Sequence, residues 1–486
     1  MKTLLNTYKR ISLLLITTIL SSSLQIRAQV KLRQPIVISG TVTKELKKEM
    51  SKNPEILVYQ EMVTGTNSNL NRSYPVEFTG NTFTVSIDPV ADFIYFQIQF
   101  LPVEQLGRYY LARPSDSIHL DVSSKYDFSF RSNSPLFACQ LKLNSLIAQY
   151  QSKYAKKLDA LKKQKANVIK EINLEVLKYE QQIPGETIAL LCVNYESEIN
   201  INYLLMLSNS IAKKADVSGM LTEKITKQID EEYHQQPISN EFIIRNSINY
   251  AQYCNDLEKL RNIIYEDSGD QNQDKFQKKF KSIQNRYSGL LREKVLTYFF
   301  LKSFKESNKA IILLDSIIND IRDPLYKEVL LNLQKVNTSG NPAYPFSLAA
   351  IDGKKYSLSD FKGKLVFCKF WFNGCGGCSR LELDLKPLKA KFINNPNVVF
   401  ISINVDKDKN NWFKGIERGI YGSSHDLQLS TFPQGVQHPL IEFYHYHGFP
   451  QMLLIDQNGQ IISSNPQRPT DKSSLMQLEN LIKSYL

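Results

Sequence analysis

The chain has 486 residues, enough for about three domains of ordinary size, and 42% of them are hydrophobic and 22% charged. This is the composition of a globular protein and excludes a largely disordered one. The formal net charge is +12, and because no arginine-rich tract or basic–aromatic alternation accompanies it, the sequence argues against a nucleic-acid-binding protein.

Residues 1–28 are typical of a cleaved secretory signal. Lys2, Lys9 and Arg10 precede an apolar run from residue 11 to about 24, and Ala28 stands at the cleavage position. The alternative is an uncleaved anchor, but the run is shorter than the roughly 20 apolar residues that span a bilayer. We therefore predict a periplasmic or cell-envelope protein with no integral membrane segment in the mature chain, in surroundings where disulfides persist.

Residues 29–135 have the pattern of short strands separated by polar turns, which predicts an N-terminal β-sandwich of antiparallel strands. Phe83, Val85 and Ile87 occupy alternate positions, and apolar residues from 94 to 100 do the same. His119 is isolated from other residues of catalytic type. We expect it to be exposed or hydrogen-bonded rather than a ligand.

Residues 136–336 change to apolar spacings of three and four, as in Leu143, Leu146, Ile147 and Tyr150. This period predicts a central helical bundle with lysine-rich solvated faces. Breaks between helices are expected at 183–186, 234–241 and 266–274.

Residues 337–486 begin a third domain, because Pro342 and Pro345 cannot continue the preceding helix. The pattern predicts a strand, helix, strand, helix, strand, strand and helix, which is a thioredoxin-like α/β plan. The expected elements are 364–371, 376–393, 398–406, 409–418, 451–456, 460–464 and 471–486. The whole chain is thus predicted to be a multidomain α+β protein.

Cys375 and Cys378 stand in the stretch NGCGGCSR, at the first strand-to-helix turn of this domain. At the N-terminus of a helix, unpaired N–H groups and the helix dipole favour a thiolate. We therefore expect Cys375 to attack a partner disulfide and Cys378, one turn further and more buried, to resolve the mixed disulfide. Two intervening glycines leave no side chain to shield the sulfur.

Zinc binding is an alternative for this cysteine pair. A structural zinc site needs four Cys or His ligands, commonly as two spaced pairs. The candidate second pair is His445 and His447, about 70 residues away and just before a proline. The prediction is that the protein binds no metal.

The run GNPAYPFSLAAIDGKKYSLSDFKGKLVFCKFWFNGCGGC resembles the entry to the TlpA/ResA-type thiol–disulfide oxidoreductases, thioredoxin-like relatives of the AhpC/TSA proteins. Later, VVFISINVDKDKNNWFKGI and HGFPQMLLIDQNGQI match further segments of that family. The resemblance covers about residues 340–486. The first 130 residues resemble a β domain of Bacteroidota envelope proteins, and we name no family resemblance for the helical region.

The resemblance implies a thioredoxin-like enzyme whose redox group is the Cys375–Cys378 disulfide, with no other cofactor. It implies a cis peptide before Pro450, and backbone groups of Phe449 that contact an incoming substrate chain. The implied partners are protein thiols or disulfides, such as cytochrome c maturation thiols, and an upstream electron donor or acceptor protein.

The chain departs from the family at three places. Lys369 stands where the family usually has Asp or Asn, Gly374 replaces a Trp, and Leu381 replaces a Glu. Glu382 follows one place later, on an expected different helix face, so the family's carboxylate is expected to be missing. Lys369 could approach Cys375 and lower its pKa, or extend to solvent, and we favour solvent.

Together with Lys369 and Glu382, two further residues are candidates for modulating the cysteine pair. They are Trp371, expected to be a core residue, and His447, three residues before Pro450. Cys368 is expected to be a buried packing residue.

Two other functions stay open. A peroxiredoxin-like peroxidase would need Pro and Thr or Ser where Cys368 and Phe372 stand. A non-catalytic envelope binding protein would hold Cys375 and Cys378 in a stable structural disulfide.

Overall fold

The computed structural model describes residues 34–48, 54–59, 72–88, 92–98, 108–124, 126–152, 158–212, 219–265, 274–307, 309–423, 425–446 and 448–486. The predicted signal segment therefore lies outside the described residues. The chain forms two compact units, one up to Tyr298 and one from Phe299 to Leu486. Within the described ranges, no helix is both long and apolar enough to cross a membrane.

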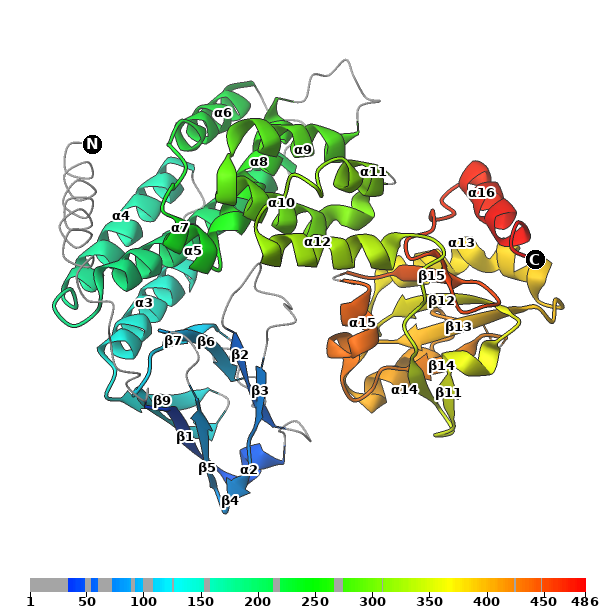
Figure 1. The fold of residues 1–486 in the computed structure, drawn as a ribbon, viewed down its shortest axis with the longest axis horizontal. Coiled ribbons are helices and arrows are strands. Elements are labelled where there is room, and N and C mark those ends of the chain that lie inside the picture. Colours follow the sequence, from blue (N-terminus) through cyan, green and yellow to red (C-terminus); the bar gives the residue numbers. More distant parts are fainter. Residues whose placement is uncertain are drawn as a thin grey trace. The chain divides into compact units, whose positions relative to one another are not determined.

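The first unit contains two sheets near its N-terminus, with strand orders β4-β5-β1-β8-β9 and β3-β2-β6-β7 (Figure 1). Apolar side chains from both sheets, among them Ile38 and Phe96, form one core. The alternation predicted around residues 83–87 is confirmed, because every second residue of β5 is buried. The bounds are β1 Ile36–Val42, α2 Lys44–Lys47, β2 Glu55–Tyr59, β3 Arg72–Pro75, β4 Phe78–Thr79, β5 Thr82–Ile87, β6 Ile94–Ile98, β7 Tyr110–Ala112, β8 Ser117–Ser124 and β9 Asp127–Ser132.

One strand pair in this region differs from the sequence prediction. Strands β1 and β8 run parallel, so the expectation of purely antiparallel strands is wrong for this pair. His119 on β8 lies 2.8 Å from Ser39 through Nδ1 and 3.1 Å from Asp121 through Nε2, so it has the hydrogen-bonding partners that the sequence analysis expected.

Helices fill the middle of the chain. The predicted breaks at 183–186 and 234–241 separate α4 from α5 and α6 from α7, and the third lies largely outside the described residues. The bounds are α3 Pro135–Ser152, α4 Leu158–Leu177, α5 Gly185–Ala212, α6 Gly219–Tyr233, α7 Glu241–Asn246, α8 Tyr250–Ile264, α9 Lys275–Arg286, α10 Gly289–Ser303, η2 Phe304–Glu306, α11 Ala310–Asp315 and α12 Pro324–Asn337. The mixed α/β content is confirmed, while the β-sandwich, the helical bundle and the domain boundaries stay predictions.

The second unit is built on a seven-stranded sheet in the order β11-β10-β14-β13-β12-β15-β16. Its central strand β12 pairs parallel with β13 and antiparallel with β15, and all seven residues of β12 are buried. The bounds are β10 Ser347–Ala350, β11 Lys355–Ser357, η3 Leu358–Phe361, β12 Leu365–Trp371, α13 Gly376–Phe392, β13 Val398–Asn404, α14 Lys409–Glu417, β14 Leu427–Ser430, η4 Gly435–Gln437, α15 Pro439–Phe443, β15 Gln451–Ile455, β16 Ile461–Ser463 and α16 Lys472–Lys483.

The seven elements predicted in this region are all present, and their ends agree with the prediction to within three residues. The sequence analysis missed the short strands β10, β11 and β14 and the short helix α15, which span three to five residues each. Segments of this length are too short to show a hydrophobic period.

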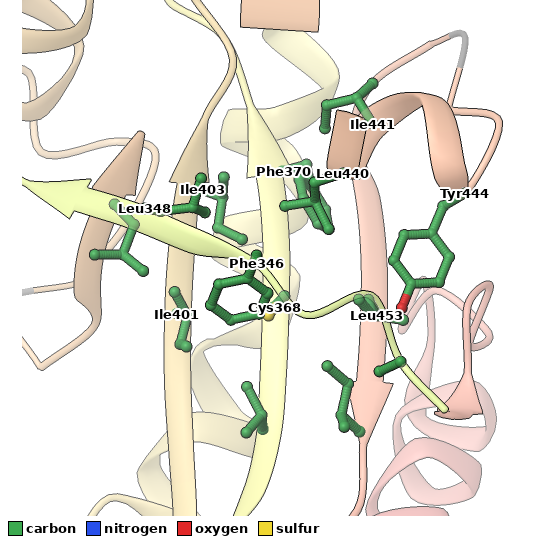
Figure 2. Close-up of a cluster of buried hydrophobic side chains, with 14 of the residues drawn as sticks. Phe346, Leu348, Cys368, Phe370, Ile401, Ile403, Leu440, Ile441, Tyr444 and Leu453 are labelled. Carbon is green, nitrogen blue, oxygen red and sulfur yellow. The ribbon is translucent and has the colours of Figure 1, made fainter. Parts of the chain in front are cut away.

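The two faces of this sheet bury different side chains because successive residues of a strand point to opposite sides. Leu365 and Phe367 pack with α13 and α16 on one face. Cys368 and Phe370 pack with α15 and the entry strand β10 on the other, and Figure 2 shows Cys368 inside that core. The expectation that Cys368 is a buried packing residue is confirmed.

Lys305 on η2 forms hydrogen bonds with the C-terminal end of α12 and with the residue that follows β16. Its Nζ donates to the Oγ of Ser464 at 2.8 Å and the backbone oxygen of Ser464 at 3.2 Å, and also to Asn337 at the end of α12. Burial lowers the pKa of Lys305 to about 7. His445 lies close enough that burial, reinforced by the Lys305 charge, lowers its pKa to about 4.

The depressed pKa of His445 predicts acid sensitivity of this unit. Unfolded His takes up a proton near pH 6.5 and folded His445 only near pH 4, so stability falls as the pH drops between these values. Between these pH values, the free energy of unfolding of the wild type should fall by up to about 3 kcal/mol more than that of His445→Asn. Asn tolerates the positive φ of 51° at this position.

Tryptophan fluorescence can follow this unfolding, because both tryptophans of the chain, Trp371 and Trp412, lie in the second unit. The control is His234→Asn, at an exposed position in the first unit. Parallel pH profiles of the wild type and His445→Asn would contradict the assignment.

Candidate active site at the Cys375–Cys378 pair

Cys375 lies at the turn between the central strand and the first helix of the sheet. Strand β12 ends at Trp371, Gly374 takes a φ of 97°, and Cys375 is the N-cap of α13. The Sγ of Cys375 accepts a hydrogen bond from the backbone N–H of Cys378 at 3.1 Å. The two cysteines form a disulfide. The pair therefore sits where backbone N–H groups can stabilise a thiolate.

The two cysteines differ in their access to solvent. Cys378 is 0% exposed and Cys375 is 5% exposed. Gly374, Gly376 and Gly377 around Cys375 are exposed and carry no side chains. A partner sulfur can thus approach Cys375, whereas the protein covers Cys378.

The loop before β15 lies directly against the disulfide. The Phe449–Pro450 peptide is cis, as the resemblance implied. The backbone oxygen of Phe449 lies 3.8 Å from the Sγ of Cys375, and a Cβ placed on Gly377 would lie 3.3 Å from the Cδ of Pro450. Arg468 donates from Nη2 to the backbone oxygen of Pro450 at 2.7 Å. The structure thus brings Phe449 and Pro450 to the cysteine pair.

Tyr421 is a site residue that the sequence analysis missed. Its ring stacks on Trp371 with centroids 4.7 Å apart, and its hydroxyl accepts from the backbone N–H of Gly374 at 2.8 Å. Both cysteines pack in one cluster with Trp371, Trp412 and Tyr421. Tyr421 therefore holds the residue next to Cys375 in place, and no local motif around it signals this role.

A buried network of charges lies one helical turn along α13 from Cys378. Glu382 binds Lys369 of β12, and it accepts from Lys389 at 2.8 and 2.9 Å. Lys389 also donates to Asp426 at 2.6 Å, and Lys369 donates to the backbone oxygen of Tyr421 at 2.5 Å. Two amines and two carboxylates thus join the central strand, the helix and the Tyr421 loop.

Lys369 is 2% exposed, so the favoured expectation that it extends to solvent is wrong. It lies on the α13 face of the sheet, where the carboxylate of Glu382 makes burial of an amine tolerable. Burial lowers its pKa to about 8, helped by the neighbouring Lys389 charge and opposed by Glu382.

Glu382 lies on another face of α13 than Leu381, as the sequence analysis expected. It is 2% exposed and stands four residues after Cys378, which places both on one side of α13. The family's position is held by Leu381, so that carboxylate is absent there as expected, while α13 supplies a different buried carboxylate at Glu382. Leu381 packs in the apolar core instead.

The remaining candidates fall outside this constellation. His447 lies outside the described residues. His445, proposed with it as an alternative zinc pair, lies beside Lys305. The described ranges contain no group of three or more His, Cys, Asp or Glu side chains placed to hold a metal.

The comparisons with known proteins concern this unit. Residues 338–481 match the family model described as Redoxin. Thiol-disulfide oxidoreductase ResA of Bacillus subtilis (strain 168) is 27% identical over 162 residues, which cover 33% of this chain and 83% of that protein. ResA of Bacillus cereus (strain ATCC 10987 / NRS 248) is 28% identical over 146 residues, or 30% of this chain and 76% of that protein.

A solved structure is similar to part of the chain. The thioredoxin domain of a thiol-disulfide oxidoreductase from Bacteroides vulgatus is 26% identical, with a TM-score of 0.26, and the match covers 30% of this chain and 97% of that one.

The sheet order, the cysteine pair and the family match define a thioredoxin-like oxidoreductase domain. Residues 338–481 are a Redoxin domain, and the chain is similar to the ResA thiol-disulfide oxidoreductases.

The charge network predicts unequal costs for removing its members. Glu382→Gln leaves two buried ammonium groups with Asp426 as their nearest carboxylate. We therefore expect the free energy of unfolding to fall by about 3 kcal/mol or more. Lys369→Met leaves Glu382 paired with Lys389, so we expect about 1–2 kcal/mol. Denaturant unfolding followed by tryptophan fluorescence measures both, and a larger loss for Lys369→Met would contradict this assignment.

The two glycines between the cysteines form a matched pair for testing the contact with Pro450. Alanine favours a helix over glycine by up to about 1 kcal/mol, and Gly376 has open space around a new Cβ. We expect Gly376→Ala to be neutral or stabilising and Gly377→Ala to be less stable, because its methyl group would crowd Pro450. Equal midpoints in denaturant would show that this contact imposes no constraint.

Proposed function

We propose that this chain exchanges disulfides with protein substrates outside the cytoplasm, through Cys375 and Cys378. The observation that carries the proposal is the asymmetry of the pair. Cys375 caps α13 among exposed glycines beside the Phe449 carbonyl, while Cys378 is fully buried. Export is supported by the signal-like residues 1–28, and the substrate class by the thiol–disulfide oxidoreductases that the redoxin domain resembles.

In this proposal the Cys375 thiolate attacks one sulfur of a substrate disulfide. That S–S bond breaks, a mixed disulfide forms, and one substrate thiolate leaves and takes up a proton. Cys378, as a thiolate, then attacks the Sγ of Cys375 and releases the second substrate thiol. Two electrons pass to the substrate and Cys375–Cys378 becomes oxidised. The same steps in reverse oxidise a dithiol substrate, with an electron donor or acceptor protein restoring the starting state.

The surrounding residues have positioning roles in this proposal. Backbone groups of Phe449, next to the cis Pro450, contact the substrate chain near the sulfur. Trp371 packs against the cysteine pair, while Lys369 and Glu382 fix the strand and the helix behind it. The redox-active disulfide is the only redox group that the proposal requires.

Cysteine variants test the exchange step. Cys378→Ser should accumulate a mixed disulfide on Cys375 with a disulfide-bonded peptide, because the resolving thiol is absent. Cys375→Ser should lose exchange altogether. Non-reducing gels and mass spectrometry identify the linked cysteine. The variant with both substitutions controls for Cys139, Cys192, Cys254 and Cys368, the remaining thiols.

The reduction potential separates exchange from a structural bond. An exchanger should lie within about −120 to −270 mV, the range of known exchange proteins. A potential below about −300 mV, together with no mixed disulfide in Cys378→Ser, would overturn the proposal in favour of a structural disulfide.

A further inference from the structure

A cavity of about 300 Å³ opens beside the loop that touches the cysteine pair. One wall consists of the last turn of α10, η2 and Leu333 of α12, and the other consists of Phe449, Gln451 and Arg468. All of these residues belong to the second compact unit. Phe449 is shared, since its side of the loop lines the cavity and its backbone oxygen lies 3.8 Å from the Sγ of Cys375.

The charged residues that line this cavity are mostly basic. Lys302, Lys305 and Arg468 line it together with a single acidic residue, Glu306. His445 also lines it, and its lowered pKa keeps its ring neutral near pH 7. The cavity therefore carries an excess of positive charge when its lysines are protonated.

Within the described part of the chain, the hydrogen-bond partners of Lys305 carry no negative charge, and its Nζ lies 5.4 Å from the ring centroid of Tyr446. Its Nζ donates to Ser464 and to the side-chain oxygen of Asn337, which are neutral groups. Burial lowers the pKa of Lys302 as well as that of Lys305. An anion in the cavity would favour the charged form of both amines, because an opposite charge at close range offsets desolvation.

We propose that this cavity binds an acidic side chain of the substrate protein, located a few residues from the cysteine that reacts with Cys375. The proposal rests on the proposed function and names the substrate class of that same site. An extended chain advances about 3.3 Å per residue, so a residue roughly one to four positions from the reacting cysteine can pass Phe449 and enter the cavity. Arg468 both lines the cavity and holds the backbone oxygen of Pro450, which connects this pocket to the cysteine pair.

In this proposal, residues of α10 and η2, which precede the redoxin domain, help to bind the substrate. Leu301, Lys302, Lys305 and Glu306 precede residue 338, where the family match begins. One wall of the cavity therefore comes from a part of the chain outside the matched family. The substrate preference it creates is a property of this chain rather than of the redoxin domain.

The test uses two disulfide peptides that differ only in Glu or Gln two residues from the reacting cysteine. We expect the wild type to react with the Glu peptide about three- to tenfold faster, as for a partly exposed ion pair with charge-assisted hydrogen bonds. Lys302→Gln should remove most of this preference. Glu306→Gln should increase it, because it removes the one carboxylate that repels the incoming acid.

The matched control is Lys355→Gln on β11, at the opposite edge of the sheet, which should keep the full preference. A neutral disulfide, 2-hydroxyethyl disulfide, carries no acidic group, so each variant's peptide rates are compared with its own rate for this disulfide, which should be equal in wild type and Lys355→Gln. Higher salt should weaken the Glu preference because it screens exposed charges.

Two failures are distinguishable. Equal rates for the Glu and Gln peptides in the wild type, or a preference that survives Lys302→Gln, would overturn the acidic-substrate pocket and leave the exchange activity intact. No reaction with either peptide or with the neutral disulfide would overturn the proposed function itself.

Discussion

The second unit depends on one buried carboxylate, Glu382, held between Lys369 and Lys389. An isolated charge at this depth would cost several kcal/mol, so each member of the network requires the others. Because Lys369 belongs to the central strand and Glu382 to the helix that carries the cysteines, their pairing sets how α13 lies over β12. Lys369 also reaches the backbone oxygen of Tyr421, whose ring and hydroxyl position Trp371 and Gly374. The network thus determines the geometry of the turn on which Cys375 stands.

The same arrangement separates the roles of the two cysteines. Helix α13 begins at the exposed end of the sheet, so its first residues face solvent and its next turn enters the protein. A spacing of three residues therefore leaves Cys375 5% exposed among exposed glycines and Cys378 fully buried. The glycines between them keep the approach open, and Gly377 also leaves room for Pro450. The two glycines of CGGC thus leave room both for an approaching partner sulfur and for Pro450.

The long elements of this unit could be predicted from the sequence because a buried strand and an amphipathic helix have clear periods. The cysteine pair and Pro450 could be placed because their motifs are local. Lys369 could not, since its partners, Glu382 and the backbone oxygen of Tyr421, lie 13 and 52 positions away and only the packed fold brings them together. One signal was available: a lone lysine inside the apolar run LVFCKFW has no solvent to reach, and so must have a buried partner. Tyr421 gave no such signal.

Lys369 and Lys305 show two ways in which the chain accommodates an amine away from solvent. Lys369 is compensated by a carboxylate of the chain itself and so closes the interior behind the cysteines. Lys305 is bound by neutral oxygens of Ser464 and Asn337, and it lines a cavity beside the loop that contacts Cys375. Neutral acceptors satisfy its hydrogen bonds, so its ammonium group, when protonated, can attract an anionic group in the cavity. The first lysine therefore serves the stability of the site, and the second can serve its choice of partner.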